Sequence, residues 1–160
     1  MEEIYKKYSR IIYNYLLGLT HNSEIAEELM QETFYSAVKN IDKFRKECSI
    51  KVWLCQIAKN KWINKIKKDK LNFYHENLEV IDELSFEDNL ENDIISREEI
   101  IDLYKKIHKL DEKTREVIYL RIRADLSFKE IGTILNKSEE WARITFYRGK
   151  IKLKEWINNE

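Results

Sequence analysis

The chain almost lacks glycine and proline, the two residues on which tight turns depend most, and this limits the folds open to it. The chain has no proline and only three glycines among its 160 residues. β-Sheet proteins need many tight turns, and those turns depend on the positive φ of glycine and the fixed φ of proline. The chain is rich instead in Lys, Glu, Ile and Leu, which suit helices. We therefore expect an all-α fold.

Charge is distributed very unevenly along the chain, although the formal net charge is zero. Residues 43–70 hold ten basic and two acidic side chains, and residues 71–100 hold one basic and ten acidic side chains. Residues 101–160 are basic again, with fourteen basic and ten acidic side chains. Because the local field decides what docks on a segment, this pattern predicts two anion-binding regions separated by an acidic one.

Hydrophobic periodicity divides the chain into two helical parts. Steps of three and four between apolar residues predict helices over 3–19, 23–41, 49–70, 94–109, 112–123, 127–135 and 138–157. In the second of these, Ser23 is the expected N-cap and Val38 belongs to the expected buried stripe. The periodicity fades between the two parts. We expect two small helical domains, residues 1–70 and 94–160, joined by an acidic linker over residues 71–93.

The strongest local signal is a helix-turn-helix near the C-terminus. Ser127 and Glu130 have the spacing of a capping box, and Asn136 suits the left-handed residue that ends a helix. Ser138 is then placed to cap the next helix. Two capped helices joined by a three-residue turn are typical of a helix-turn-helix unit.

The last helix divides into a packing face and a polar face. Ala142, Phe146, Gly149 and Leu153 share one side, and the other side offers arginines, a lysine, an aliphatic residue and a tyrosine. Arginine can read guanine edges, an apolar group can contact a thymine methyl, and lysine can contact phosphates. This mixture favours a reader of the DNA major groove over an ordinary solvated helix face.

The other basic segment, residues 44–70, carries Trp53 and Trp62 among lysines and asparagines. Lysines neutralise phosphates and an aromatic face supports an unstacked base, as single-stranded DNA binding requires. The alternative is that both tryptophans belong to the core and that the lysines are solvated. The spacing does not decide between these readings, although the apolar neighbours of Trp53 favour at least partial burial.

Nothing in the chain predicts catalysis, a metal site or a membrane segment. The three histidines are scattered, and the motifs of phosphate loops and zinc proteases are absent. Cys48 and Cys55 have no partners for a zinc site, and we expect them to be free, reduced thiols in a cytoplasmic protein. No stretch has the length and apolar character of a membrane span.

Two motif-bearing segments resemble the sigma-70 family of RNA polymerase sigma factors, in its extracytoplasmic-function (ECF) group. Residues 26–68 contain the runs A-E-x-L-x-Q-E-T-F and W-L-x-x-I-A-x-N, which resemble the conserved N-terminal domain of that family. Residues 110–153 resemble its C-terminal domain. The resemblance covers nearly the whole chain, and it implies a non-enzymatic factor, without a cofactor, that binds core RNA polymerase and promoter DNA.

The resemblance also implies site residues. The helix that docks on the clamp helices of the largest polymerase subunit would use Glu28, Gln31 and Glu32. Binding of the melted −10 element would use Arg45, Lys51, Trp53, Asn60, Asn64, Lys67 and Lys68. Reading of the −35 element would use Arg143, Ile144, Thr145, Tyr147, Arg148 and Lys150.

Further partners are implied by the resemblance alone. They are the flap of the second polymerase subunit and an anti-sigma factor, often membrane-anchored in this group, while the acidic linker would follow a path that RNA later occupies. Some positions depart from the family pattern, notably Ile144 and Thr145 in the −35 helix, Asn64 in the −10 helix and Gly132 in the helix-turn-helix. The −35 sequence is therefore not transferable from better-known members.

Two other classes of protein remain open from the residues themselves. A stand-alone helix-turn-helix regulator would be a dimer on a palindromic operator, without a need for polymerase. An all-helical interaction protein would bind no DNA. The A-E-x-L-x-Q-E-T-F helix argues against the first, because a stand-alone reader has no use for it.

Overall fold

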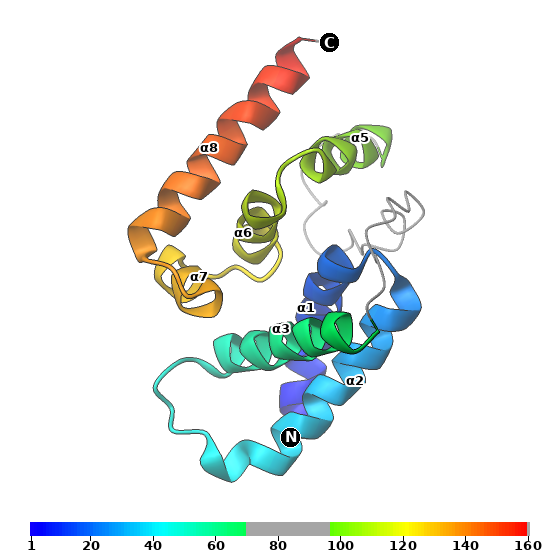
Figure 1. Ribbon diagram of the computed structural model, residues 1–160, viewed down its shortest axis with the longest axis vertical. Coiled ribbons are helices and arrows are strands. Elements are labelled where there is room, and N and C mark those ends of the chain that lie inside the picture. Colours follow the sequence, from blue (N-terminus) through cyan, green and yellow to red (C-terminus); the bar gives the residue numbers. More distant parts are fainter. Residues whose placement is uncertain (70–96, 160) are drawn as a thin grey trace.

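The computed structural model describes residues 1–69 and 97–159, and all regular secondary structure in these ranges is helical. The N-terminal half (residues 1–69) contains α1 (Glu2–Thr20), α2 (Ser23–Asn40), the short 3-10 helix η1 (Ile41–Lys43) and α3 (Ile50–Asp69). The C-terminal half (residues 97–159) contains α5 (Arg97–His108), α6 (Glu112–Ile122), α7 (Phe128–Leu135) and α8 (Glu139–Asn158) (Figure 1). The all-α prediction is confirmed, and the linker expected over 71–93 lies outside the described residues.

In the N-terminal half, α1 and α2 form an antiparallel pair and α3 packs across both (Figure 1). The chain reverses at His21, which has a left-handed φ of 51° and donates its backbone N–H to the Leu17 carbonyl at 2.9 Å. Leu16, Leu29 and Ala58, one from each helix, are almost completely buried at the centre. The three amphipathic helices therefore share one core.

The N-cap of α2 differs from the prediction. Asn22, not Ser23, occupies the cap, with extended backbone angles and its side chain accepting a hydrogen bond from the Ile25 N–H at 3.0 Å. Asn and Ser cap helices about equally well, so residue type does not distinguish the two positions. The turn at His21 decides the matter, because it places Asn22 in the extended conformation that a cap needs.

In the C-terminal half, α7 and α8 form the expected helix-turn-helix. The Ser127 side chain accepts from the Glu130 N–H at 3.1 Å, and the Glu130 carboxylate accepts from the Ser127 N–H at 3.1 Å. Asn136 ends α7 with a left-handed φ of 55°, and Ser138 caps α8 by accepting from the Trp141 N–H at 3.0 Å. The capping box and both ends of the turn are confirmed.

Gly132 allows the turn to lie against α7. A Cβ atom at this position would lie 2.6 Å from the Lys137 carbonyl oxygen and 3.0 Å from the Ser138 carbonyl carbon. Those neighbours are backbone atoms, which cannot move aside as a side chain can. The close approach explains why glycine occupies a helical position where its propensity is poor.

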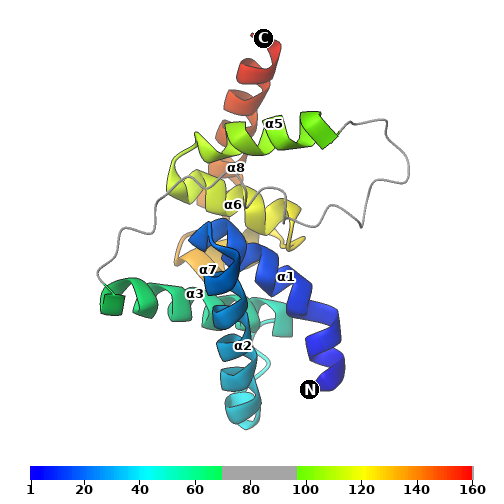
Figure 2. The ribbon, with the colours of Figure 1, turned by 90° about the vertical axis from the view of Figure 1, so that its right-hand side faces the viewer.

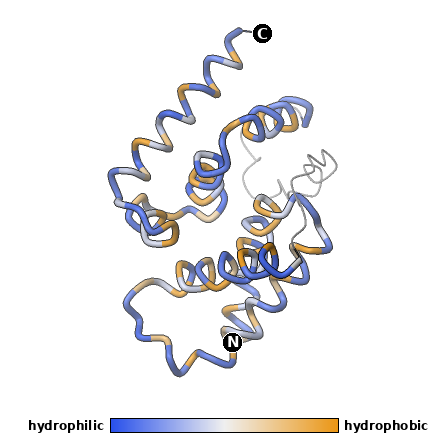
Figure 3. Tube along the Cα trace, viewed as in Figure 1, coloured by the Kyte–Doolittle hydropathy of each residue, from blue (hydrophilic) through white to orange (hydrophobic). Residues whose placement is uncertain are grey.

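The two halves pack against each other. Buried apolar residues of both halves belong to one cluster, in which α1 lies against α6 (Figure 2) and the start of α3 lies against α7 (Figure 1). Figure 3 shows apolar and polar residues mixed along every helix, as helices with one buried side require. The outer sides of α2, α3 and α8 remain available for partners.

Candidate nucleic-acid interface

The outer face of α8 presents the residues predicted to read DNA. Its exposed members are Arg143, Ile144, Tyr147, Arg148 and Lys150, while Thr145 is partly buried. The opposite face is buried through Ala142, Gly149 and Leu153. α8 therefore has the amphipathic division that the sequence predicts, with its polar side facing outward.

Gly149 fixes how closely α8 approaches α6. A Cβ atom there would lie 2.6 Å from Thr114 Cγ2 and 2.9 Å from Ile118 Cδ1. A larger residue would push the two helices apart. The orientation of the reading face thus depends on a glycine that is itself buried.

An aromatic and cationic cluster supports the same face from α7. The Phe128 ring lies 5.5 Å from Phe146 and 6.1 Å from Tyr147 between ring centroids. The guanidinium groups of Arg121 and Arg143 lie 4.5 Å and 5.7 Å from the Phe128 ring. Phe128 and Arg121 were not among the residues predicted to support DNA binding. The sequence offered one signal for this cluster, which was an aromatic residue directly after the Ser127 cap.

α3 carries a polar stripe. Asn60, Asn64, Lys67 and Lys68 are all exposed, and their spacing of four, three and one places them along one side of the helix. Arg45 is exposed in the loop before α3. Five of the seven predicted −10 residues are therefore exposed.

The two tryptophans of the basic segment have different environments. Trp62 is 3% exposed and belongs to the core. Trp53 is partly buried, and its ring centroid lies 4.8 Å from that of Phe44. The two tryptophans therefore differ, because Trp62 is core and Trp53 stays partly exposed.

Lys51 is not grouped with the other cations of α3. It is partly buried, and its Nζ donates to the Asp125 carbonyl oxygen of the C-terminal half at 3.3 Å. The start of α3 thus faces the C-terminal half, whereas Lys67 and Lys68 at its end face solvent.

A mixed acidic and apolar stripe runs along α2. Glu28, Gln31 and Glu32 are exposed, and the next turns of the same side carry Tyr35 and Val38, which are 62% and 51% exposed. The prediction that Val38 is buried is wrong. Ala37, which belongs to the same expected stripe, is buried, whereas Val38 lies about 100° further around the helix. The sequence carried a signal for this exposed side, because Tyr35 and Val38 follow Gln31 by four and seven residues and so share its side of the helix.

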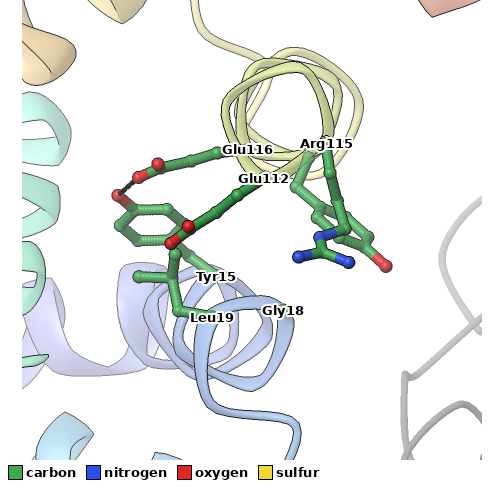
Figure 4. A pocket seen from close by; sticks show the side chains of 7 residues that line it. Tyr15, Gly18, Leu19, Glu112, Arg115 and Glu116 are labelled. Atoms are coloured by element: carbon green, nitrogen blue, oxygen red, sulfur yellow. Dashed lines mark hydrogen bonds between the residues drawn. The ribbon is translucent and has the colours of Figure 1, made fainter. Parts of the chain in front are cut away.

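A small pocket lies between α1 and α6. Tyr15 and Gly18 line one side, and Arg115, Glu116 and Tyr119 line the other (Figure 4). Burial and the negative charge of Glu116 raise the pKa of the Tyr15 hydroxyl well above its ordinary value. The hydroxyl therefore stays protonated and donates to Glu116. The pocket thus lies at a contact between the two halves.

Neither thiol is activated. Burial raises the pKa of Cys55 to about 12, and burial together with nearby carboxylates raises that of Cys48. Both thiols are free. Among residues 1–69 and 97–159, no group of three or more His, Cys, Asp or Glu side chains could hold a metal ion. No helix within the same ranges is long and apolar enough to span a membrane.

Comparison with known proteins gives two family matches. Residues 4–71 match sigma-70 region 2, and residues 107–153 match sigma-70 region 4. RNA polymerase sigma factor YlaC of Bacillus subtilis (strain 168) is 31% identical over 157 residues, with 97% of this chain and 90% of the relative covered. ECF RNA polymerase sigma factor SigW of the same organism is 32% identical over 166 residues, with 98% and 87% covered.

Solved structures share the fold. The sigma factor RpoE in complex with the anti-sigma factor NepR, from Bartonella quintana, has a TM-score of 0.70 at 18% identity and is matched over 99% of this chain and 98% of that one. CnrH in complex with the cytosolic domain of CnrY has a TM-score of 0.71 at 18% identity, over 99% and 88%.

The fold and its surfaces define an all-helical protein with a C-terminal helix-turn-helix. With both family regions matched in order, the chain belongs to the sigma-70 family of RNA polymerase sigma factors. Like its ECF relatives, it is a non-enzymatic factor that directs transcription initiation.

Proposed function

We propose that three separate surfaces perform the work of this sigma factor. The stripe of α2 docks on core polymerase, α3 with its preceding loop holds the melted −10 element, and α8 reads the −35 element. The observation that carries the proposal is the placement of exposed carboxylates on α2 and of exposed cations on α3 and α8.

The α2 surface uses Glu28, Gln31 and Glu32 against the basic clamp helices of the largest polymerase subunit. Tyr35 and Val38 extend the same surface with exposed apolar area. Interfaces commonly combine a desolvated apolar centre with a polar rim, and aromatic residues often dominate the binding energy. This supports a docking site in which the carboxylates give orientation and Tyr35 supplies contact area.

The −10 surface combines phosphate contacts with one aromatic face. The DNA phosphate backbone is contacted by Asn60, Asn64, Lys67 and Lys68 on α3 and by Arg45 from the preceding loop. Trp53 offers its ring to an unpaired base. Extruding a base costs a few kcal/mol, which these contacts offset. Lys51 joins this set once its contact with Asp125 is released.

The −35 surface lies in the major groove. Arg143 and Arg148 are suited to base edges or phosphates, Ile144 to a thymine methyl, and Lys150 to the backbone. Thr145 and Tyr147 complete the contacting positions.

The wider architecture follows from the same assignment. Residues 1–70 and 94–160 act as the polymerase and promoter domains, and residues 71–93 act as the acidic linker that follows the later path of RNA. Core polymerase fixes the separation of the two DNA-binding surfaces, so the second contact gains effective concentration. The protein works in the cytoplasm, binds the flap of the second polymerase subunit and is held by an anti-sigma factor. RpoE of Bartonella quintana, which shares the fold, is in complex with the anti-sigma factor NepR.

The −35 assignment is tested in reconstituted holoenzyme. We expect Arg148→Ala to weaken promoter binding by about 1–3 kcal/mol, as loss of one good side-chain contact to a base does. Lys113→Ala, which removes an exposed positive charge from α6, is the matched control. Nuclease footprints should lose protection at the −35 element alone; undiminished −35 protection with Arg148→Ala would remove Arg148 from the reading face.

A further inference from the structure

A buried carboxylate joins the two halves of the molecule. Tyr15 Oη donates to Glu116 Oε1 at 2.6 Å, and Lys59 Nζ donates to the same oxygen at 2.8 Å (Figure 4 shows the Tyr15 bond). Glu116 is 6% exposed and lies on α6, whereas its two partners lie on α1 and α3. One side chain of the C-terminal half is therefore held by two helices of the N-terminal half.

Further polar contacts continue along the start of α3. Ser49 Oγ donates to Glu130 Oε2 at 3.2 Å, and Lys51 Nζ donates to the Asp125 carbonyl at 3.3 Å. Both donors lie at or just before the first turn of α3, and both acceptors lie at or just before α7. The contact between the halves thus covers the start of the helix whose other end carries the exposed −10 cations.

The chemistry of the contact suits an interface that opens. A buried carboxylate is costly unless it is paired, and Glu116 is paired only while the halves are together. When they separate, water solvates the carboxylate, Lys59 and Tyr15, so the open state pays no lasting penalty for the charge. Charge-assisted hydrogen bonds of this kind are short and strong but reversible.

The closed arrangement also removes a predicted DNA contact. Lys51 is engaged with Asp125, and its neighbours on that side of α3 face α7 instead of solvent. Only the fraction of molecules in which this contact is open can use the whole −10 surface, and the apparent affinity falls in proportion to that fraction.

We infer that Glu116 is an autoinhibitory latch: held by Tyr15 and Lys59, it keeps the C-terminal half closed over the start of α3, so the isolated protein must open before it can grip a promoter. The inference rests on the proposed role of α3 in −10 binding. It adds a specific internal partner for Lys59, a cation that is outside the predicted −10 set.

Charge reversal tests the latch in the full-length protein. Glu116→Lys and Lys59→Glu each place like charges together, and the double variant restores an opposite-charge pair. Glu155→Lys makes the same charge change on the exposed side of α8 and controls for the general gain in DNA attraction. Circular dichroism checks that each variant keeps its helical content.

Two readouts follow, both without polymerase. Small-angle X-ray scattering should give a larger radius of gyration for each single variant, and the wild-type value for the double variant and for Glu155→Lys. Binding to a promoter duplex with an unpaired −10 segment should be about tenfold tighter for Glu116→Lys than for Glu155→Lys, which corresponds to about 1.4 kcal/mol.

Unchanged scattering in well-folded Glu116→Lys would overturn the latch itself. Larger dimensions without tighter DNA binding would overturn its inhibitory role. If Glu116→Lys loses helical signal, the latch is judged from the scattering of Lys59→Glu and the double variant. A wild-type radius of gyration for Lys59→Glu would then overturn it. Transcription by wild-type protein with core polymerase is assayed in parallel. That assay tests the proposed function, whereas the scattering measurement tests the latch independently of it.

Discussion

At the scale of single residues, His21 links the fold to pH. Its ring lies 4.6 Å from that of His108 between centroids, at a contact between the two halves. Burial, the neighbouring His108 and the positive charge of Arg115 lower the pKa of His21 to about 3. The folded protein therefore holds this imidazole neutral at pH values where the unfolded chain protonates it.

The consequence is a loss of stability on acidification. Between the unfolded pKa of about 6.5 and the folded pKa, the unfolded chain binds the extra proton, so stability falls as pH falls. We expect His21→Asn, which tolerates the left-handed backbone, to reduce this loss by about 1.4 kcal/mol between pH 7.5 and 5.5. Urea unfolding at the two pH values measures the difference. An unchanged pH dependence in the variant would show that His21 is not the group responsible.

Gly132 gives a prediction in which two effects oppose each other. Helix propensity alone predicts that Gly132→Ala stabilises the protein by up to about 1 kcal/mol. The approach of the Lys137 carbonyl to within 2.6 Å of the new Cβ predicts the reverse, and we expect a net loss of about 1–3 kcal/mol from overpacking. The free energy of unfolding, compared with that of the exposed neighbour Thr133→Ala, decides the sign. A more stable Gly132→Ala variant would contradict the close approach.

Whether a residue is buried, exposed or a helix cap could be predicted from the sequence where hydrophobic periodicity or cap chemistry gave a single answer. The buried face of α8 and the capping residues Ser127, Asn136 and Ser138 follow from periodicity and cap chemistry. Trp62 and Val38 show the limit. An aromatic residue between lysines serves equally well as core or surface, and a one-residue rotation of about 100° separates Ala37 from Val38. Only packing against a neighbouring helix resolves such cases.

At the scale of elements, helix boundaries followed the sequence within a few residues. α6, expected over 112–123, spans Glu112–Ile122, and α7, expected over 127–135, spans Phe128–Leu135. The described part of α5 begins at Arg97, so its expected start at residue 94 stays a prediction. Capping residues mark the starts of α6 and α7 clearly. Residues 94–96 lie outside the described residues.

α2 gives the prediction for polymerase binding. If α2 docks on a basic clamp as we propose, Glu32→Lys should weaken binding to core polymerase, because it sets like charges together, while the exposed position leaves the fold intact. Glu3→Lys, which makes the same charge change at an exposed position of α1, is the control. Titration of labelled protein with core enzyme should show a loss of about tenfold or more for Glu32→Lys alone, about 1.4 kcal/mol. Equal affinities for the two variants would move the docking surface elsewhere.

The apolar part of that stripe is tested separately. Tyr35→Ala should also weaken core binding, by about 2 kcal/mol if Tyr35 is one of the dominant contacts. Lys39 lies 4.4 Å from the Tyr35 ring, so Lys39→Ala controls for loss of that internal contact. The same titration provides the comparison, and wild-type affinity of Tyr35→Ala would confine the docking site to the carboxylates.

At the scale of the whole molecule, the sequence predicted two helical parts but not their contact. The charge pattern indicated basic regions on both sides of an acidic stretch, and the structure shows those regions on α3 and α8. The ion pair between Lys59 and Glu116 joins residues 57 positions apart, and the Tyr15 bond spans 101 positions. No local pattern encodes such pairs, because each residue alone looks like ordinary helix surface.

In the proposed function, one chain uses an acidic helix for polymerase and two basic helices for the promoter. The most direct test is to mix the purified protein with core RNA polymerase on a library of candidate promoters and to map the start sites of the transcripts. We expect a stable complex that initiates at defined positions, each preceded by common −35 and −10 sequences. If no complex forms, or if transcripts begin at the same positions without the protein, the proposed function is wrong.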